Sequence, residues 1–503
     1  MKPVEAADYT VGVVGVGAMG QGIAQVSAQG GMTTIMVDAK PGAAAAARES
    51  VVQRIHRLVE KGRVSDGDAA DAIGRLHVGD GLDGLAKADT VVEAVFEDLD
   101  VKQRLFREIE AAVSRSCIIA SNTSSIPIAS IARVCEHRDR IAGLHFFNPV
   151  PLMKLVEVIR AAETSDDVVA ALFELGKRMT RTPVVVQDSP GFLVNMGGRA
   201  FTTEGLRIAH DGVATPSQID AIMRDCCHFR MGPFELMDLT GIDVNYPVSQ
   251  IIYDGYSHDP RLKTSPNHRA KFDAGMFGRK TGQGWYRYED GKAVDVPSPD
   301  FTTGAAPATQ VILHQPDNPD LAAFCKTIGL QTTFEDDEVS PILSASVGVD
   351  ASTTASVEGI DHRRLVCVDV FWDTTKRVTM MTAPGADAAA RDAVAAAIIA
   401  TGRKVTAIKD GPGFVAQRMC AMIANLGCYM AEIGLAEPED IDLAMELGLN
   451  YPLGPLKLAD RFGVVETLTA LEAIQEITGD DRYRPTTWLG RRAMLSLPIH
   501  APS

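Results

Sequence analysis

The sequence lacks the features typical of secreted, membrane-spanning or metal-binding proteins. Its eight cysteines include no C-x-x-C pair and no spacing typical of a zinc site or a disulfide framework. No apolar run reaches the ~18 residues that a membrane-spanning helix needs, and the first ten residues have no apolar signal-peptide core. We therefore expect a reduced, soluble, cytoplasmic protein with no membrane partner and no metal.

Positive charge is scarce as well. Lysine and arginine number 49 against 65 aspartates and glutamates, which gives a formal net charge of −16. Such a surface repels nucleic acid and anionic membranes, so we expect neither as a partner. An anionic small substrate would need a local cluster of basic residues. The chain has 503 residues, 46% of them apolar, enough for about three globular domains.

Apolar β-branched runs alternate with helical segments through the first part of the chain. The runs lie at residues 10–16, 33–38, 89–95, 116–122 and 140–148. This alternation predicts a doubly wound, Rossmann-like parallel sheet, an α/β fold that we assign to residues 1–187. After the DSPGF run at 188–192 the apolar spacing becomes helical, so an all-α domain is expected over 188–290.

An internal repeat organises the second half of the chain. Segment 182–243 recurs at 404–465 without a gap, each residue displaced by 222 positions. Four markers keep this register: Pro190 and Pro412, Asp220 and Asp442, Pro233 and Pro455, Asp238 and Asp460. Two unrelated helical bundles that merely share capping residues would not keep it, so a second helical domain is expected over 404–503.

A weaker echo precedes the repeat. EHRDRIAGLHFFNP at 136–149 is similar to DHRRLVCVDVFWDT at 361–374. No glycine-rich loop lies between residues 320 and 360, so we expect a degenerate Rossmann-like remnant over 321–403. Residues 291–320 are rich in Pro, Asp, Thr and Gly, which is typical of a linker.

A glycine-rich turn follows the first expected strand. Gly15, Gly17 and Gly20 form a G-x-G-x-x-G motif, with Met19 inside it, that opens a helix. Such glycines permit the tight turn, the approach of a pyrophosphate and close helix–strand packing. Asp38 ends the second strand, where a carboxylate would bind the ribose 2′-hydroxyl and select NAD over NADP. The alternative is that Asp38 only caps the turn after it.

Polar side chains follow two further strands, at the edge where open α/β sheets bind ligands. Ser124 lies in SNTSS at 121–125, whose hydroxyls either cap the next helix or touch nicotinamide and substrate. His145 follows a later strand, and a lone histidine on an apolar strand is often only a core residue. Two short strands joined by a turn would bring Glu157 beside His145 Nδ1. This is the base and carboxylate pairing that a dehydrogenase of alcohols needs.

Together these motifs resemble those of the L-3-hydroxyacyl-CoA dehydrogenase family. The runs that carry the resemblance are GVGAMGQGIA, VVEAVFEDLDVKQRLF, SNTSSIPIASIA, GLHFFNPVPLMKLVEVI, DSPGFLVN, MGPFELMDLTG and FGRKTGQGWY. They cover residues 10–290 almost continuously, and the repeat at 404–465 resembles the family's C-terminal domain again. The tandem arrangement is similar to the long bacterial members that act on 3-hydroxybutyryl-CoA or 3-hydroxyadipyl-CoA.

The resemblance implies roles for individual residues. His145 would be the general base that removes the 3-hydroxyl proton, and Glu157 would stabilise the imidazolium. Asn195 and Ser124 would hydrogen-bond the substrate oxygen. The family's contacts to the nicotinamide side of NAD fall on two further residues, Glu97 and Lys102. Without the resemblance, these two would be read as a surface pair at a helix start.

A basic helical segment meets the need for a local cationic cluster. Arg54, Arg57 and Lys61 recur at helical spacing on one face of residues 48–63; the alternative is a solvated basic face. In the family, the residues at Ser50 and Arg57 would contact CoA, which carries several phosphates. An acyl-CoA substrate is therefore expected.

The second copy lacks the proposed catalytic groups, although its scaffold markers persist. The aligned pairs are His145 and Val370, Glu157 and Thr379, and Asn195 and Gln417. A residue that serves the scaffold should survive duplication wherever the fold does, whereas a catalytic residue need survive only where the reaction occurs. The loss of these groups in one copy therefore favours their functional interpretation in the other.

The repeat also bears on assembly and specificity. We expect 404–465 to pack on 188–243 as an intramolecular pseudo-dimer, or the chain to form a homo-oligomer.

An arginine commonly follows the catalytic Asn in the family, but this chain has Met196 there and Arg418 in the second copy. HFRMGP at 228–233 also departs from the family's GYPMGP, which leaves the acyl-chain preference open.

The expected reaction is the oxidation of a short-chain L-3-hydroxyacyl-CoA to the 3-oxoacyl-CoA with NAD. Two alternatives stay open: an NAD-dependent β-hydroxy-acid or sugar-acid dehydrogenase that does not use CoA, and a non-catalytic NAD-binding structural protein. The basic segment favours the thioester, and the complete catalytic set favours an enzyme.

Overall fold

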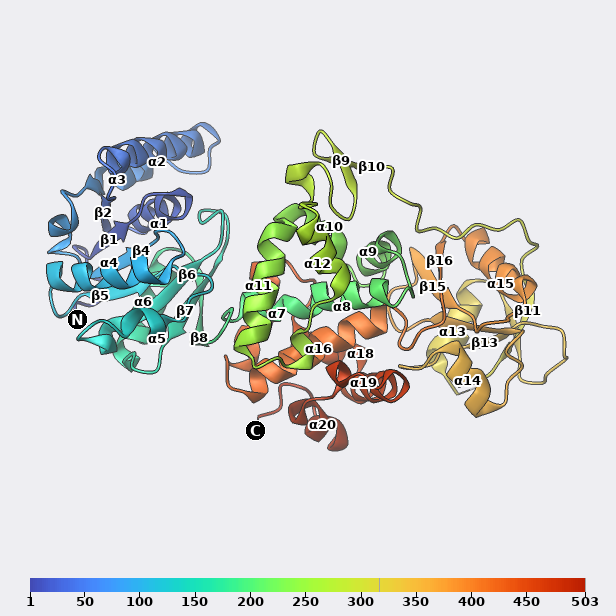
Figure 1. Ribbon diagram of the computed structural model, residues 1–503. Coiled ribbons are helices and arrows are strands. Elements are labelled where there is room, and N and C mark those ends of the chain that lie inside the picture. Colours follow the sequence, from blue (N-terminus) through green and yellow to red (C-terminus); the bar gives the residue numbers. More distant parts are fainter. Residues whose placement is uncertain (316, 503) are drawn as a thin grey trace. The chain divides into compact units, whose positions relative to one another are not determined.

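The computed structural model describes residues 1–315 and 317–502 of the chain. It divides into two compact units, one of Met1–Met196 with Gly434–Leu449 and one of Gly197–Ile433 with Asn450–Ser503. Figure 1 shows the helices and strands of both. Among the described residues, no helix is both long and apolar enough to cross a membrane.

The first unit is built on an eight-stranded sheet with the order β3-β2-β1-β4-β5-β6-β7-β8. Its strands are β1 (Thr10–Val14), β2 (Thr33–Val37), β3 (Leu76–Val78), β4 (Thr90–Glu93), β5 (Ile118–Ser121), β6 (Ile141–Phe146), β7 (Leu155–Arg160) and β8 (Thr182–Gln187). All neighbouring strands are parallel except β6 and β7. Strands β1, β4 and β5 are buried at every position, as expected for a sheet covered on both faces.

Helices cover this sheet and confirm the predicted fold class. They are α1 (Ala18–Gln29), α2 (Ala43–Glu60), α3 (Asp66–Gly74), α4 (Leu99–Ala112), α5 (Ile128–Ala132), α6 (Asp166–Arg178) and α17 (Pro438–Leu449). Side-chain caps set two helix starts, since Asp98 accepts from Val101 N–H and Ser165 accepts from Val168 N–H. The alternation of strands and helices that was predicted from the sequence is therefore present in the order β1-α1-β2.

The second unit contains the helices of both repeats. Helix α7 (Val194–Gly197) crosses the boundary, and the first repeat continues with α8 (Arg199–His210), α9 (Pro216–Asp225), α10 (Pro233–Thr240), α11 (Ile242–Gly255) and α12 (Pro266–Asp273). The second repeat supplies α16 (Ala416–Glu432), α18 (Pro455–Phe462), α19 (Val464–Thr478) and α20 (Thr487–Met494). Helix α8 packs against α16, its counterpart in the repeat.

Matching backbone features show that the two copies share one scaffold. The P-G-F turn has the same left-handed backbone in each, at Phe192 and at Phe414. A Cβ on Gly205 would lie 2.7 Å from Pro233, and one on Gly427 would lie 2.5 Å from Pro455. These close approaches require glycine at equivalent places in both copies.

A smaller sheet precedes the second helical repeat. Its order is β12-β11-β13-β14-β15-β16, and only β14 and β15 are antiparallel. Its elements are β11 (Gln310–Leu313), α13 (Pro319–Thr327), β12 (Gln331–Thr333), β13 (Ile342–Ser344), α14 (Ala351–Glu358), β14 (Leu365–Asp369), β15 (Arg377–Met381), α15 (Ala388–Ala400) and β16 (Lys404–Ile408).

The segment expected as a linker, 291–320, contains regular structure. Strand β10 (Lys292–Val294) pairs with β9 (Arg287–Glu289), and β11 is a sheet strand with its last three residues buried. The sequence signal was weak because QVIL is only four residues long and lies among Pro, Thr and Asp. The smaller sheet therefore includes residues from Gln310, before the start at 321 that was expected for this part of the chain.

The two repeats exchange helices between their sheets. Helix α17, from the second repeat, packs on β7 and β8, while α9, from the first, packs on β15 and β16. Two equivalent hydrogen bonds of 2.9 Å mark the exchange, from Gln187 N to Leu435 O and from Lys409 N to Val213 O. The two bonds are related by the 222-residue displacement, so both repeats take part in the same kind of exchange.

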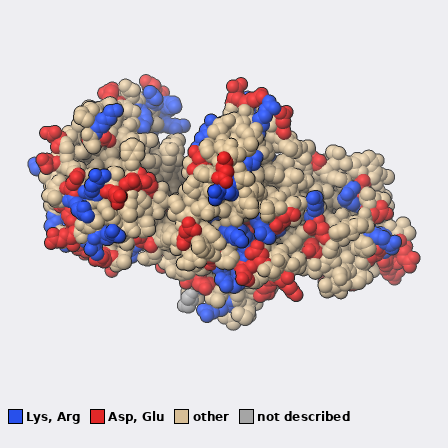
Figure 2. All heavy atoms as spheres, viewed as in Figure 1, with Lys and Arg blue, Asp and Glu red and all other residues tan. Residues whose placement is uncertain are grey.

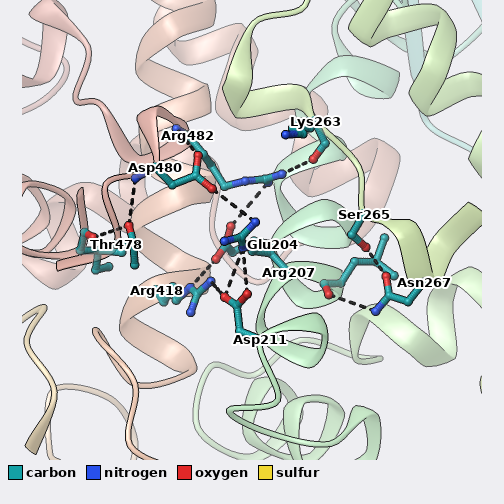
Figure 3. A network of polar contacts seen from close by, with 12 residues as sticks. Glu204, Arg207, Asp211, Lys263, Ser265, Asn267, Arg418, Thr478, Asp480 and Arg482 are labelled. Carbon is teal, nitrogen blue, oxygen red and sulfur yellow. Dashed lines mark hydrogen bonds and ion pairs between the residues drawn. The ribbon is translucent and has the colours of Figure 1, made fainter. Parts of the chain in front are cut away.

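A buried ion pair joins the packed helices α8 and α16. Arg418 Nε lies 2.6 Å from Glu204 Oε1, and the two side chains are 1% and 0% exposed. Figure 3 shows this pair within a network that includes Asp211 and Arg482. In the repeat register the counterparts are Met196 and Leu426, so each copy retains one half of the pair.

This pair gives a test of the packing between the repeats. We expect Arg418→Met to lower the free energy of unfolding by up to about 3–5 kcal/mol, because it removes the guanidinium that lies 2.6 Å from the buried Glu204 carboxylate. Glu204 then keeps only the Tyr483 hydroxyl at 2.9 Å and Arg482 at 3.6 Å. The double variant Arg418→Met with Glu204→Leu carries the residue types of the counterpart positions, Met196 and Leu426. Its free energy of unfolding should fall by less than that of the single variant. Urea unfolding measures both, with Arg287→Met, from an exposed pair, as the neutral control. A double variant as unstable as the single one would contradict the account.

Candidate active site

The glycine-rich turn follows β1 at the carboxyl edge of the sheet. Gly15 has φ +89°, and a Cβ there would lie 2.7 Å from Ala94 O. A Cβ on Gly20 would lie 1.8 Å from Gly15 O, so neither position accepts a side chain. Gly17 begins α1, and a Cβ there would meet nothing within 4 Å. The turn is therefore closed toward the protein and open at Gly17, which fits the approach of a pyrophosphate to the helix N-terminus.

Asp38 lies beside this turn. Its Oδ2 accepts from Val16 N–H at 3.0 Å and its Oδ1 from Lys40 N–H at 2.9 Å. It therefore does cap the turn after β2, and it is also fixed against the glycine-rich turn. Each carboxylate oxygen keeps a further lone pair for a ligand hydroxyl. Met19, also within the motif, is partly buried against the hydrophobic core.

His145 and Glu157 form a close pair across β6 and β7. The antiparallel register places the two residues opposite each other, and His145 Nδ1 lies 2.6 Å from Glu157 Oε2. Glu157 is fully buried, and its Oε1 accepts from Leu193 N–H at 3.1 Å and Val194 N–H at 2.8 Å. A carboxylate held this way accepts a hydrogen bond from Nδ1–H, which leaves Nε2 as the basic nitrogen of a neutral ring.

Asn195 and Ser124 meet at the same edge. Asn195 Nδ2 donates to Ser124 O at 3.2 Å. Asn195 directly follows the two residues whose N–H groups hold Glu157, so one turn positions both the carboxylate and the amide. The structure thus brings together all four residues that the sequence suggested for catalysis: His145, Glu157, Ser124 and Asn195.

Glu97 and Lys102 are not both surface residues, because Glu97 is exposed but Lys102 is buried. Glu97 Oε1 accepts from Thr123 Oγ1 at 2.6 Å and from Ser124 N–H at 2.9 Å. Burial acts to raise the pKa of Glu97, but the bond from Thr123 and the charge of Lys102 outweigh it and hold the pKa below its usual range. Lys102 is 1% exposed and contacts Glu97 Oε2 at 3.4 Å, so it reaches the site through that carboxylate.

Sequence reasoning missed Glu93, at the end of β4. This residue is fully buried, accepts from Lys102 Nζ at 2.7 Å and from Ser121 Oγ at 2.6 Å, and so ties β4 to β5. The available signal was an ionisable residue inside the apolar run DTVVEAV, since a buried carboxylate needs partners.

The basic residues expected to contact CoA lie along α2. Arg54 is half-buried and donates to Gln21 Oε1 at 3.1 Å, while Gln21 Nε2 donates to Val16 O. Burial, and secondarily the charge of Arg57, lowers the pKa of Arg54. Arg57 and Lys61 are exposed and Ser50 is half-buried. Figure 2 shows basic side chains gathered over this part of the first unit.

The sheet register corrects one alignment between the copies. Asp369 pairs with Thr379 across β14 and β15, as His145 pairs with Glu157 across β6 and β7. The counterpart of His145 is therefore Asp369, and the alignment with Val370 is wrong by one position because the two hairpins differ in length. Gln417 Nε2 donates to Ser346 O at 3.2 Å, as Asn195 donates to Ser124 O. The second copy keeps the scaffold without the histidine–carboxylate pair.

The two residues that depart from the family's motif have local partners. His228 Nε2 lies 3.2 Å from Asp373 Oδ2, and Arg230 donates to Asn450 Oδ1 at 3.2 Å. Within the described residues, no group of three or more His, Cys, Asp or Glu side chains is placed to hold a metal ion.

Comparison with known proteins gives matches along nearly the whole chain. The NAD binding domain of 3-hydroxyacyl-CoA dehydrogenase matches residues 10–189, and the C-terminal domain of the same enzyme matches 191–288 and again 413–496. The 3-hydroxyadipyl-CoA dehydrogenase of Escherichia coli is 33% identical over 97% of this chain and 98% of its own. A probable 3-hydroxybutyryl-CoA dehydrogenase of Deinococcus radiodurans is 37% identical over 55% of this chain and 99% of its own.

A solved structure resembles the whole architecture. The crystal structure of 3-hydroxybutyryl-CoA dehydrogenase from Escherichia coli superposes with a TM-score of 0.86 and 32% identity. The match covers 97% of this chain and 98% of that one, so both copies of the repeat are included.

The buried Asp369 gives a pH-dependent test of the second copy. Burial raises the pKa of Asp369 to about 6. As the pH rises from about 4 to 6, the unfolded carboxyl ionises while the folded one keeps its proton, so the folded state loses stability. Relative to Asp369→Asn, the wild type should lose up to about 3 kcal/mol over this range. Urea unfolding of both proteins at several pH values measures the difference. If their free energies of unfolding changed with pH in parallel, the burial of a protonated carboxyl would be contradicted.

Proposed function

Because the chain belongs to the 3-hydroxyacyl-CoA dehydrogenase family, we propose that it oxidises short-chain L-3-hydroxyacyl-CoA thioesters with NAD. The reaction is 3-hydroxyacyl-CoA + NAD⁺ ⇌ 3-oxoacyl-CoA + NADH + H⁺. Relatives named for 3-hydroxyadipyl-CoA and 3-hydroxybutyryl-CoA support these two as candidate substrates. The observation that carries the proposal is the 2.6 Å contact between His145 Nδ1 and buried Glu157.

In the proposed reaction the protein's part is to move one proton and hold one oxygen. His145 Nε2 takes the 3-hydroxyl proton, and Glu157 stabilises the imidazolium that forms. The Asn195 amide and the Ser124 hydroxyl donate hydrogen bonds to the substrate oxygen as it becomes a carbonyl. NAD, when bound, accepts the hydride from C3 of the thioester.

We assign the binding of NAD and of CoA to further residues of the first unit. The α1 N-terminus at Gly17 would hold the pyrophosphate of NAD, and Asp38 the ribose of its adenosine. Glu97 would contact the nicotinamide side, with Lys102 holding it in place. For CoA we propose Ser50, Arg54 and Arg57 of α2, with Lys61 at its C-terminal end.

We also propose that one chain acts as its own dimer. The reciprocal bonds from Gln187 to Leu435 and from Lys409 to Val213 support this, because each repeat completes the sheet of the other. All eight cysteines are buried and none forms a disulfide, which suits the reducing environment of the cytoplasm, where we place the enzyme.

Replacing either member of the histidine–carboxylate pair tests the proposal. We expect His145→Gln and Glu157→Gln to lower kcat by about 10²–10⁴-fold, because they remove the base or its counter-charge. NADH oxidation with acetoacetyl-CoA and with 3-oxoadipyl-CoA measures kcat, and NAD affinity should stay nearly unchanged. Turnover at the wild-type rate in His145→Gln would overturn the assignment.

Activity on free acetoacetate distinguishes the proposed function from that of a dehydrogenase that does not use CoA. An enzyme of β-hydroxy acids that does not use CoA would reduce acetoacetate as well as its thioester. The proposed enzyme should discriminate strongly in favour of the thioester. A wild-type protein inactive on all three substrates would instead indicate a structural NAD-binding protein.

A second substitution tests the cofactor site. Asp38→Ala should weaken NAD binding and narrow the preference for NAD over NADP, because it removes both a ribose acceptor and the charge that repels a 2′-phosphate. Asp71→Ala, on the exposed surface of α3, is the matched control and should change neither. Titration of each variant with NAD and with NADP measures the ratio of the two dissociation constants. An unchanged ratio in Asp38→Ala would remove this residue from the cofactor site.

A further inference from the structure

Helix α17 belongs to the copy without catalytic groups, yet it packs on the sheet that carries them. It contacts β7, the strand of Glu157, and β8. Its buried residues include Ile441, Ala444 and Met445, and the Gln187 N to Leu435 O bond fixes the loop just before it. The second repeat therefore supplies part of the support of the candidate active site.

Gly448 of α17 lies close to the turn beside the catalytic groups. A Cβ on this residue would lie 3.0 Å from Leu155 Cδ2 and 3.1 Å from Val194 Cγ2. Val194 N–H donates to Glu157 Oε1 at 2.8 Å, and Glu157 Oε2 contacts His145 Nδ1. A short chain of contacts thus leads from a glycine in the second copy to the catalytic pair in the first.

The equivalent place in the other copy shows that the scaffold does not require glycine here. The counterpart of Gly448 is Cys226, which follows α9 and lies against β15 with its Sγ 3.5 Å from Arg377 O. Gly448 also has no left-handed φ that would demand glycine. Within a helix, glycine costs about 0.5–1 kcal/mol relative to alanine. Its presence at 448 is explained by the close approach to Val194.

We propose that Gly448 is a positioning residue for the His145–Glu157 pair, and that the degenerate copy serves catalysis through α17. The absent side chain lets α17 approach the turn at Leu193 and Val194, whose N–H groups orient the Glu157 carboxylate. A methyl group at 448 would displace Val194 by a few tenths of an ångström, and with it the Glu157 oxygens. This inference rests on the proposed role of the pair.

The test is Gly448→Ala, alone and combined with Val194→Ala, which removes the two Cγ atoms that the new methyl group meets. We expect the single variant to lower kcat about tenfold, since small misplacements of catalytic groups are costly. The KM for NAD should stay within twofold. The double variant should recover most of the lost kcat, because the new Cβ then meets only Leu155 Cδ2, the end of a flexible side chain that can turn aside.

Gly490→Ala is the matched control, because this glycine also lies in a helix, α20, and a Cβ there would meet nothing within 4 Å. It should leave kcat unchanged. Thermal unfolding of all variants shows whether a loss of kcat follows a loss of fold. If the single variant is unfolded, the folded double variant carries the test.

Two outcomes would overturn the inference. One is a wild-type kcat in Gly448→Ala while His145→Gln is inactive, which leaves the proposed function intact. The other is a double variant that recovers no kcat relative to Gly448→Ala, or that is folded but as inactive as His145→Gln. A wild-type kcat in His145→Gln would instead contradict the proposed function itself.

Discussion

The structure of the candidate site depends on one buried carboxylate. Glu157 has no exposed surface, and a charge in that position is stable only if every oxygen has a donor. Two backbone N–H groups satisfy one oxygen and His145 Nδ1 satisfies the other. The carboxylate therefore determines three features at once: the tautomer of the imidazole, the turn that begins α7, and the place of Asn195.

Duplication explains how this turn is kept rigid. The two repeats exchange α9 and α17, so each sheet is covered in part by a helix that lies about 150–290 residues away in the chain. The ion pair between Arg418 and Glu204 is one-sided, because Met196 and Leu426 occupy the counterpart positions. In an isologous contact between two copies of the first repeat, Glu204 would face Met196, so the ion pair with Arg418 favours the contact between unlike copies. A copy that has lost its chemistry thus remains necessary for the architecture.

The sequence predicted those features that depend on local pattern. The glycine-rich turn, the Rossmann-like sheet and the His145–Glu157 pairing all follow from strand order and short-range spacing, and the fold class was confirmed. Other features could not be predicted from the sequence. Strand β11 is too short to stand out, the counterpart of His145 depends on hairpin length, and the burial of Lys102 depends on Glu93 in a neighbouring strand. The exchange of α17 joins segments far apart in sequence, which no local pattern reveals.

The central claim is that Glu157 fixes the proton on Nδ1 of His145 and leaves Nε2 free to accept one. The most direct measurement is ¹⁵N NMR of the histidine-labelled protein, with His145 assigned by its absence in His145→Gln. At a pH where the ring is neutral, the account predicts a protonated Nδ1 and an unprotonated Nε2. A neutral ring with its proton on Nε2, or a Nδ1 signal unaffected by Glu157→Gln, would contradict it.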